Sequence, residues 1–300
     1  MNLPRIALLV YSLFSLTRIL FCADPAASKQ NDGGSQPSLL RLLDGTVSKS
    51  ELASVFVHPI QCDSDGYIYL MGDIDGTSGI RKLSPKGQRV ATFTSTSAPE
   101  LQVSLAAYFA LGADGNVYQL AYLRDKFDRA ILIYNKDGSY RAGIKLETPR
   151  GAKDWFPEQI AAFPSGDLLI AGTVPEPNSA VRAPFTGIFD QNGTLKREIS
   201  LADDAELQKM AESGDPRVIA PGHESSNRAI DSGHAEPAED GNIYIMRRLT
   251  PTILYAVSPG GEVVRRFTVN PGDADFTPIL IHIAGNRIAL EFWNPKVERD

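Results

Sequence analysis

The sequence predicts an all-β fold, a closed β-propeller built from four-stranded antiparallel blades. Three observations predict it: one hairpin pattern recurs along the chain, the glycines in its turns are regularly spaced, and its two halves occur an unequal number of times. A repeated unit of this size indicates a repeat architecture because each unit must bury its faces against its neighbours.

The first half of the repeat is an apolar strand, a tight glycine turn and an alternating strand, which we call strands a and b. It occurs at residues 63–72, 112–122, 163–172, 238–247 and 283–292. Asp-Gly and Asn-Gly between β-rich segments are hairpin signals, because glycine accepts the positive φ that such turns require. Each occurrence therefore predicts an antiparallel a–b hairpin.

The second half of the repeat is another hairpin, with strands c and d. It occurs at residues 80–93, 131–144, 187–199 and 254–267. Each complete repeat therefore predicts one blade with the strand order a-b-c-d.

The turn glycines of the a–b hairpins set the period. Gly66, Gly115, Gly166, Gly241 and Gly285 lie 49, 51, 75 and 44 residues apart, so the long interval carries an insertion, at residues 200–237. Radial stacking of such units covers both faces of each blade. A β-sandwich is the alternative fold, but it has no reason to keep this period.

The hairpin count predicts how the ring closes. Five a–b hairpins are followed by only four c–d hairpins, and residues 38–48 supply the missing pair at the other end of the chain. Joining the two terminal hairpins in one blade hides two open sheet edges. The direct count is five blades, and six would require a degenerate blade, for example within the insertion.

The repeat, with its Asp-Gly-[Asn/Tyr]-[Ile/Val]-Tyr-[Ile/Leu] core and closing Phe, resembles NHL-type and related bacterial propeller repeats over residues 38–294. The resemblance implies a propeller, commonly six-bladed. It implies little about function, because propellers serve as binding modules, lyases and hydrolases alike.

The N-terminus predicts export. Arg5 followed by an apolar run and small residues is typical of a secretory signal peptide at residues 1–23, with an uncleaved membrane anchor as the alternative. Residues 24–37 form a polar linker, and residues 38–300 form the propeller domain. We expect a periplasmic or extracellular protein with no membrane span after signal removal. Cys62 is then interpreted as a small buried hydrophobe without a disulfide partner.

The charge of the chain limits its partners. The formal net charge is −6, and loss of Arg5 and Arg18 with the signal makes it −8. Nucleic acid is therefore an unsuitable partner, because affinity for its backbone comes from Lys and Arg that displace counterions. We expect a monomer.

Strand direction predicts which face carries function. The short glycine turns lie at one face, whereas the b–c and d–a connections lie at the other, including residues 72–79, 94–104 and 122–130. Function tends to lie on irregular loops held by a rigid scaffold. The b–c/d–a face is therefore the expected binding face.

Candidate binding residues lie on these connections. Six basic side chains could form a rim that attracts carboxylate or phosphate groups, and the alternative is that they are paired, solvated charges. They are Arg124, Lys126, Arg129, Arg182, Arg247 and Arg248. Trp155 could anchor a partner or pack between blades.

The insertion supplies the remaining candidates. Residues 201–213, after a Ser200 cap and before Gly214, predict an amphipathic helix across a rim of the propeller. The polar loop that follows contains His223, Glu224 and His234, although their spacing matches no standard ligand pattern.

No local catalytic or phosphate-binding motif is present, and Asp73 and Asp75 lack the glutamate of a calcium loop. We therefore assign no catalytic residue, metal or cofactor. The sequence favours a binding module for a protein, peptide or glycan, more consistent with a non-enzyme than an enzyme. The alternative is a metal-assisted enzyme that resembles propeller lactonases or lyases, with carboxylates and histidines at the channel mouth.

Overall fold

The computed structural model describes residues 6–9, 55–124, 128–152, 154–176, 181–215, 218, 233–249, 251–270, 277–284 and 287–293. The chain divides into two compact units. The N-terminal unit contains residues 15–124 and 129–143, and the C-terminal unit contains residues 1–14, 125–128 and 144–300.

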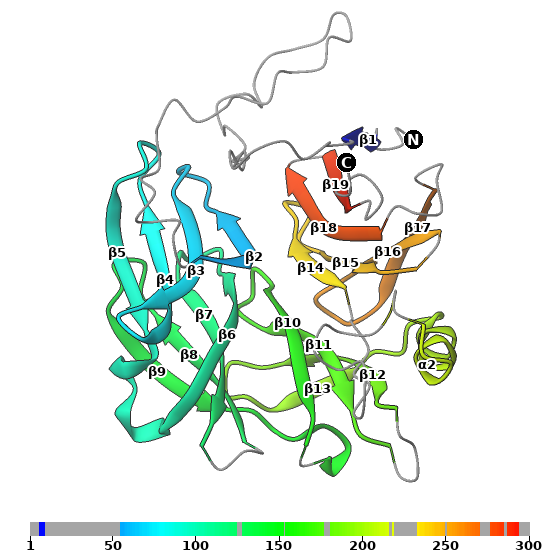
Figure 1. Ribbon diagram of the computed structural model, residues 1–300, viewed down its shortest axis with the longest axis horizontal. Coiled ribbons are helices and arrows are strands. Elements are labelled where there is room, and N and C mark those ends of the chain that lie inside the picture. Colours follow the sequence, from blue (N-terminus) through cyan, green and yellow to red (C-terminus); the bar gives the residue numbers. More distant parts are fainter. Residues whose placement is uncertain are drawn as a thin grey trace, which may run out of the picture. The chain divides into compact units, whose positions relative to one another are not determined.

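The N-terminal unit contains two four-stranded antiparallel sheets (Figure 1). The first is formed by β2 (Val55–Cys62), β3 (Ile68–Ile74), β4 (Thr77–Leu83) and β5 (Arg89–Thr94). The second is formed by β6 (Val103–Leu111), β7 (Val117–Leu123), β8 (Arg129–Tyr134) and β9 (Tyr140–Lys145), of which residues 140–143 belong to this unit. Two 3-10 turns, η2 (Ser95–Ser97) and η3 (Pro99–Leu101), connect the sheets.

The C-terminal unit repeats this arrangement. Its first sheet contains β10 (Phe156–Ala162), β11 (Leu168–Val174), β12 (Ala183–Phe189) and β13 (Leu195–Glu198), and η4 (Pro149–Gly151) precedes it. Its second contains β14 (His234–Pro237), β15 (Ile243–Arg247), β16 (Thr252–Val257) and β17 (Val263–Val269). The hairpin of β18 (Thr277–Ala284) and β19 (Arg287–Trp293) follows, and β1 (Ile6–Leu9) pairs with β19 in parallel.

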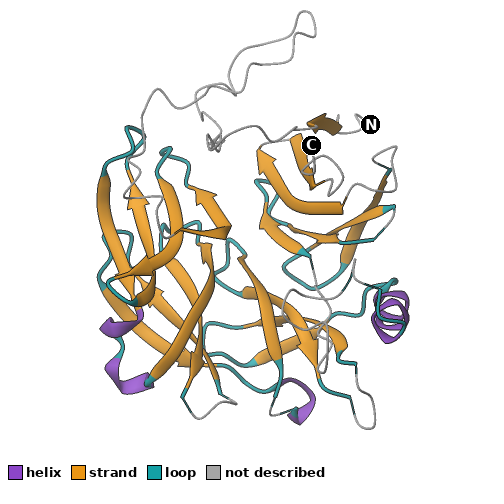
Figure 2. Ribbon diagram, viewed as in Figure 1, coloured by secondary structure: helices purple, strands orange, loops and turns teal. Residues whose placement is uncertain are grey.

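Most of the described residues are in strands, and the short helices lie in the chain segments that connect one sheet to the next (Figure 2). Consecutive strands pair as antiparallel neighbours in each four-stranded sheet. Repeated four-stranded meanders of this kind are β-propeller blades. The all-β propeller class predicted from the repeat is therefore confirmed.

An Asp carboxylate and a Gly with positive φ form the turn of the first a–b hairpin. In the first blade the Asp63 carboxylate accepts hydrogen bonds from the amides of Asp65 and Tyr67, at 3.1 and 2.9 Å. Gly66 has a φ of 79°, a conformation that costs a residue with a Cβ. The carboxylate of this Asp-x-Asp-Gly sequence is therefore used by the turn itself.

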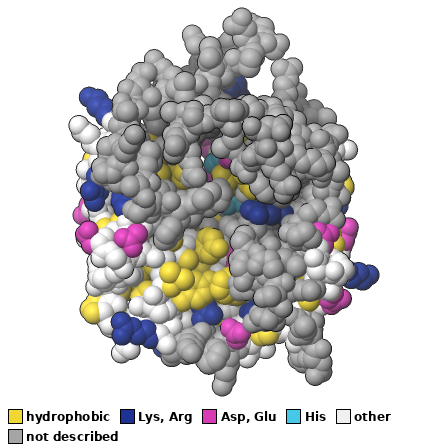
Figure 3. Space-filling model, in the orientation of Figure 1, with side chains coloured by type: hydrophobic (Ala, Val, Ile, Leu, Met, Phe, Trp, Pro, Cys, Tyr) yellow, Lys and Arg dark blue, Asp and Glu magenta, His cyan; other side chains and the backbone are white. Residues whose placement is uncertain are grey.

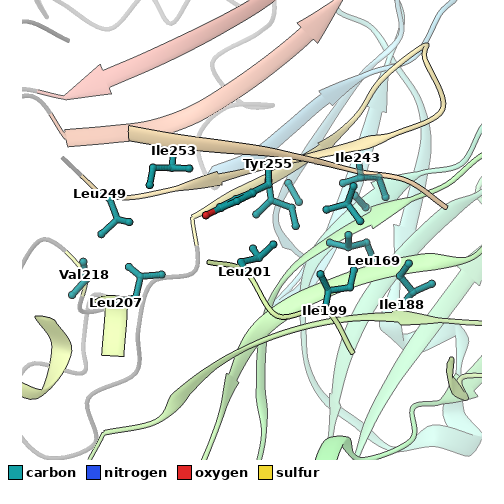
Figure 4. Packing of buried hydrophobic residues seen from close by; sticks show 14 of the residues in the cluster. Leu169, Ile188, Ile199, Leu201, Leu207, Val218, Ile243, Leu249, Ile253 and Tyr255 are labelled. Atoms are coloured by element: carbon teal, nitrogen blue, oxygen red, sulfur yellow. The ribbon is translucent and has the colours of Figure 1, made fainter. Parts of the chain in front are cut away.

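Apolar side chains pack between neighbouring blades of the same unit. In the N-terminal unit, Phe93 of the first sheet lies edge-on to Tyr134 of the second, with ring centroids 5.6 Å apart. In the C-terminal unit, Leu169 and Ile188 of one blade meet Ile243 and Tyr255 of the next (Figure 4). Strands that bury both faces form these layers, which hold the loops at their ends in fixed positions.

The predicted helix is present with a different start. α2 (Asp204–Glu212) begins after Asp203, not after Ser200, and Gly214 follows it with a φ of 80°. α2 contacts β12, and its residues Leu207 and Ala211 are buried in the same hydrophobic cluster as Tyr255 of β16 (Figure 4).

The structure bears on three further expectations, which concern the hairpin at residues 38–48, the state of Cys62 and a membrane span. The hairpin proposed at residues 38–48 lies outside the described residues, and β1 is the strand paired with β19. Cys62 is disulfide-bonded in the full-length chain, whereas its interpretation as a small buried hydrophobe applies to the chain after loss of Cys22. Within the described part of the chain, no helix has the length and apolar character needed to cross a membrane.

Candidate binding site

A hollow of about 390 Å³ lies in the N-terminal unit, where three loop regions meet. Small-molecule sites typically have about 300–1,000 Å³. Its lining comes from Gly76, Thr77, Ser78, Ser95, Thr96, Ala98, Pro99, Gln102, Val103, Ser104, Leu105, Ala106 and Arg124. These residues belong to the connections at 72–79, 94–104 and 122–130, and to the start of β6, so the hollow lies on the expected binding face.

The first wall is the β3–β4 turn. Ile74 pairs with Thr77, so the predicted irregular connection is a two-residue turn of Asp75 and Gly76, whose φ values are 52° and 82°. Positive φ at both residues is typical of a type I′ hairpin turn. The Thr77 hydroxyl donates its proton to the Ile74 carbonyl at 2.9 Å, which leaves its lone pairs to accept further hydrogen bonds.

The second wall is the connection between the two blades. Ala98, between η2 and η3, is buried and fixes the loop, and Gln102 ends it in the left-handed region with a φ of 47°. The Gln102 carbonyl accepts a hydrogen bond from the Arg124 amide at 3.1 Å. This bond ties the loop to the end of β7.

The third wall is the start of β6, where Ser104 interrupts the pairing register between Val103 and Leu105. A β-bulge of this kind redirects a side chain and is frequent beside functional sites. The Ser104 hydroxyl donates to the Tyr122 carbonyl at 2.9 Å. Like Thr77, Ser104 therefore presents only acceptor lone pairs to a ligand.

Among the lining residues that the structure describes, Arg124 is the one with a charged side chain, and it is exposed. The remaining polar lining consists of hydroxyl groups and the Gln102 amide, and Leu105, with 49% of its surface exposed, adds an apolar rim. The hollow thus combines one positive charge with neutral donors and acceptors in a chain whose formal net charge is −6.

Two other predicted basic residues are buried. The guanidinium of Arg129 lies 4.5 Å from the ring centroid of Tyr122, its partner across the β7–β8 pair. Arg182 donates to the Thr173 hydroxyl at 3.0 Å and pairs with the Asp154 carboxylate at 3.3 Å. Both side chains therefore hold the b–c ends of their blades rather than forming a solvent-facing rim.

Arg247 is fully buried as well. Its guanidinium lies 2.8 Å from the Asp204 carboxylate and 3.8 Å from that of Asp203. Burial raises the pKa of Asp204, while the charge of Arg247 opposes that change. The neighbouring Arg248 is partly buried and donates to the Ile279 carbonyl at 3.4 Å. Arg247 thus anchors the start of α2.

Trp155 is not an exposed anchor, and the rings that it contacts belong to β12 of its own blade. Its side chain is fully buried, and its ring stacks on Phe189 and meets Phe185 edge-on, with centroids 5.9 and 5.7 Å away. Lys126, His223 and Glu224 lie outside the described residues. His234 is buried as the first residue of β14, so the polar loop predicted to contain both His223 and His234 ends before His234.

Figure 3 shows basic and acidic side chains scattered over the described surface of one face, without a single basic field. This distribution agrees with the burial of the three arginines above. Arg124 is therefore the predicted basic residue that the structure brings to a hollow.

The first strands of the C-terminal blades carry titratable groups. β10, β14 and β18 come from successive blades, and β14 lies beside β18 (Figure 1). Burial raises the pKa of Glu236 in β14 to about 8 and lowers that of His282 in β18. Among the residues that the structure describes, no group of three or more His, Cys, Asp or Glu side chains could hold a metal ion.

The hydroxyl lining was not among the sequence candidates. Thr77, Ser95 and Ser104 lie in connections assigned to the binding face, and the run TFTSTS at residues 92–97 is rich in hydroxyl groups. That enrichment is the signal that could have found them. Their convergence depends on the bulge at Ser104 and on the turn at Gly76, which no local pattern revealed.

No family model and no curated protein matches the chain. Its structure is similar to that of a protein of unknown function from Bacteroides caccae, with 14% identity over 74% of this chain and a TM-score of 0.43. It is also similar to the Dos1 propeller, with 10% identity over 77% of this chain and a TM-score of 0.43. A third similar structure is that of an inactive virginiamycin B lyase from Staphylococcus aureus, with 12% identity over 78% of this chain and a TM-score of 0.42. The chain spans 65%, 50% and 76% of these three structures, respectively. Similarity at this level gives no argument about ligand or activity.

Proposed function

We propose that the chain is an exported, non-enzymatic β-propeller of NHL-like type that binds a glycan, peptide or protein through its b–c/d–a face. The observation that carries the proposal is the hollow at Arg124, where three connections of that face supply the walls. Hydroxyl and amide groups on such walls satisfy a polar ligand directly, which favours a glycan among the three ligand classes.

Export is supported by the signal-like sequence at residues 1–23. A secreted or periplasmic binding module would meet glycans and peptides as extended, hydrated polymers. A shallow hollow on the loop face of a rigid scaffold suits that kind of ligand.

A blocking substitution tests the binding function. Thr96 is exposed in η2, so Thr96→Trp should fill the hollow without disturbing the blades. Lys86→Trp, in the exposed β4–β5 turn, is the matched control because it adds the same side chain at the other end of the blade. Binding to arrays of immobilised glycans and peptides should be lost in Thr96→Trp and kept in Lys86→Trp. Unchanged array binding in Thr96→Trp, or no binding by the wild type, contradicts the proposal.

The enzymatic alternative is motivated by Glu236. A carboxyl group with a pKa of about 8 on a first strand has the proton affinity of a general acid at neutral pH. If this alternative holds, calcium or another divalent cation should raise the melting temperature and a chelator should lower it, because a ligand of the native state stabilises it. Melting temperatures unchanged by metals and chelator would remove the metal-assisted form of the alternative.

A further inference from the structure

We infer that the hollow at Arg124 selects a carboxylated sugar, such as a uronic acid residue, over neutral sugars and over phosphate esters. This inference rests on the proposed binding function and names the ligand class for the same site. It is carried by three features of the described lining: the guanidinium group of Arg124, the fixed acceptors and the apolar rim.

The guanidinium group of Arg124 selects a carboxylate. Arg124 is the one charged residue in the described part of the lining, and its backbone is fixed by the bond from its amide to the Gln102 carbonyl at 3.1 Å. A guanidinium group presents two parallel N–H donors that match the two oxygens of a carboxylate. One guanidinium group balances the single charge of a carboxylate, whereas a doubly charged phosphate ester would keep one negative charge without compensation.

The fixed acceptors select hydroxyl groups. Thr77 and Ser104 each donate their one proton to a backbone carbonyl, of Ile74 and Tyr122 respectively, at 2.9 Å. Their oxygens can therefore only accept from a ligand. The O–H groups of a sugar supply the matching donors, whereas the oxygens of a phosphate dianion would face these lone pairs and be repelled.

The apolar rim suits the carbon skeleton of a sugar. Leu105 belongs to the same lining and is half-exposed beside Ser104, and the lining residue Val103 is partly buried. A pyranose ring presents C–H groups between its hydroxyls and can cover such a surface while its polar groups bond to the walls. Ser78, Ser95 and the Gln102 amide, also in the lining, add donors for ring and glycosidic oxygens.

The test compares three sugars that differ only at C6, namely glucuronate, glucose and glucose 6-phosphate, with inorganic phosphate as a fourth probe. Binding is measured by calorimetry or saturation-transfer NMR on the wild-type chain. Glucuronate should bind most tightly. Glucose should bind more weakly by about 10- to 100-fold, the contribution of hydrogen bonds to a charged group.

Two charge variants assign the effect to Arg124. Arg124→Gln should reduce glucuronate affinity to that of glucose and leave glucose binding unchanged. Arg124→Lys should restore part of the affinity, since it keeps the charge but loses the fork of donors. Arg141→Gln, an exposed residue of β9 outside the lining, is the matched control and should bind like the wild type.

A third variant tests the fixed acceptors. Ser104→Ala removes one acceptor and should weaken glucose and glucuronate by the same factor. Circular dichroism and melting temperature show that each variant is folded.

The outcomes separate this inference from the proposed function. Equal binding of glucose and glucuronate, tighter binding of either phosphate probe, or an equal effect of Arg124→Gln and Arg141→Gln overturns the choice of a carboxylated sugar. The binding function still stands in those cases if array binding is lost in Thr96→Trp. If Thr96→Trp changes nothing, the proposed function fails as well.

Discussion

At the scale of single residues, buried arginines replace the basic rim expected from the sequence. Arg247 is the clearest case, because its side chain is fully buried and its partners Asp203 and Asp204 begin α2. The Tyr255 hydroxyl also donates to Asp203. Such a network is costly to break, since removal of one partner leaves buried charges without compensation.

Arg247→Ala should lower the free energy of unfolding by about 3–5 kcal/mol, the usual cost of breaking a buried ion pair. Urea unfolding followed by circular dichroism measures the loss. The control is Arg265→Ala, because Arg265 is about half-exposed and lies 3.8 Å from Asp240, so its loss should cost only about 0–1 kcal/mol. Equal losses in the two variants would contradict the anchoring role of Arg247.

Glu236 gives the second prediction for a single residue. Its pKa is raised from 4.5 to about 8 by burial, so the native state holds a proton that the unfolded state has released. This group's effect on stability should therefore become more unfavourable as pH rises from about 4.5 to about 8, and then stay constant.

Glu236→Gln should remove this effect, since the amide is not titratable. The melting temperature of the variant relative to the wild type should increase between pH 5 and pH 8. A difference between the two melting temperatures that does not change with pH would show that the pKa of Glu236 is not raised in the native state.

At the scale of elements, local turn chemistry explains what the sequence could predict. The a–b and c–d hairpins were predictable because alternating strands flank Asp-Gly and related turns, whose glycines, such as Gly66 and Gly241, adopt positive φ. The β3–β4 turn and the bulge at Ser104 were not, because both depend on how one strand pairs with another. The helix start moved to Asp203 because Arg247, distant in sequence, binds the acids there.

The candidate site could likewise be predicted only in part, because its side chains come from segments that meet only in the folded chain. Arg124 could be predicted as a basic residue in a binding-face connection. Its hydroxyl neighbours Thr77 and Ser104 could not, because serine and threonine are common in loops and only their meeting in space distinguishes them. Arg129 and Arg182 were assigned to the rim because sequence alone does not show which long side chains fold back onto Tyr122 or Asp154.

The outer strand β17 leads to a prediction about solubility. Val263 and Val264 are exposed, and Arg265 and Arg266 follow them on the same open edge. Charged residues on an edge strand prevent pairing with other chains. The double variant Arg265→Thr/Arg266→Thr should therefore self-associate, measured by light scattering during storage.

The control for this prediction is Lys196→Thr/Arg197→Thr in β13. That strand loses the same two charges but has only four residues and no exposed valines. It should remain monodisperse. Equal scattering by both double variants would show that charge loss alone, rather than the apolar edge of β17, drives association.

At the scale of the whole molecule, the chemical state of Cys62 depends on whether the proposed signal peptide has been removed. The chain has two cysteines, Cys22 and Cys62, and Cys62 is disulfide-bonded in the full-length chain. Cleavage after residue 23 removes Cys22. The exported form should then contain one thiol, and thiol titration of the unfolded mature protein should find one per chain. Zero thiols, together with a mass that includes Cys22, would contradict the proposed cleavage position.

Amide chemical-shift mapping during titration with glucuronate shows directly whether the hollow at Arg124 is the binding site. We expect the perturbed amides to be those of lining residues, with Gly76, Ser95, Gln102 and Arg124 among them. Perturbations confined to other residues, such as those around His234 and Glu236 in β14, would contradict it.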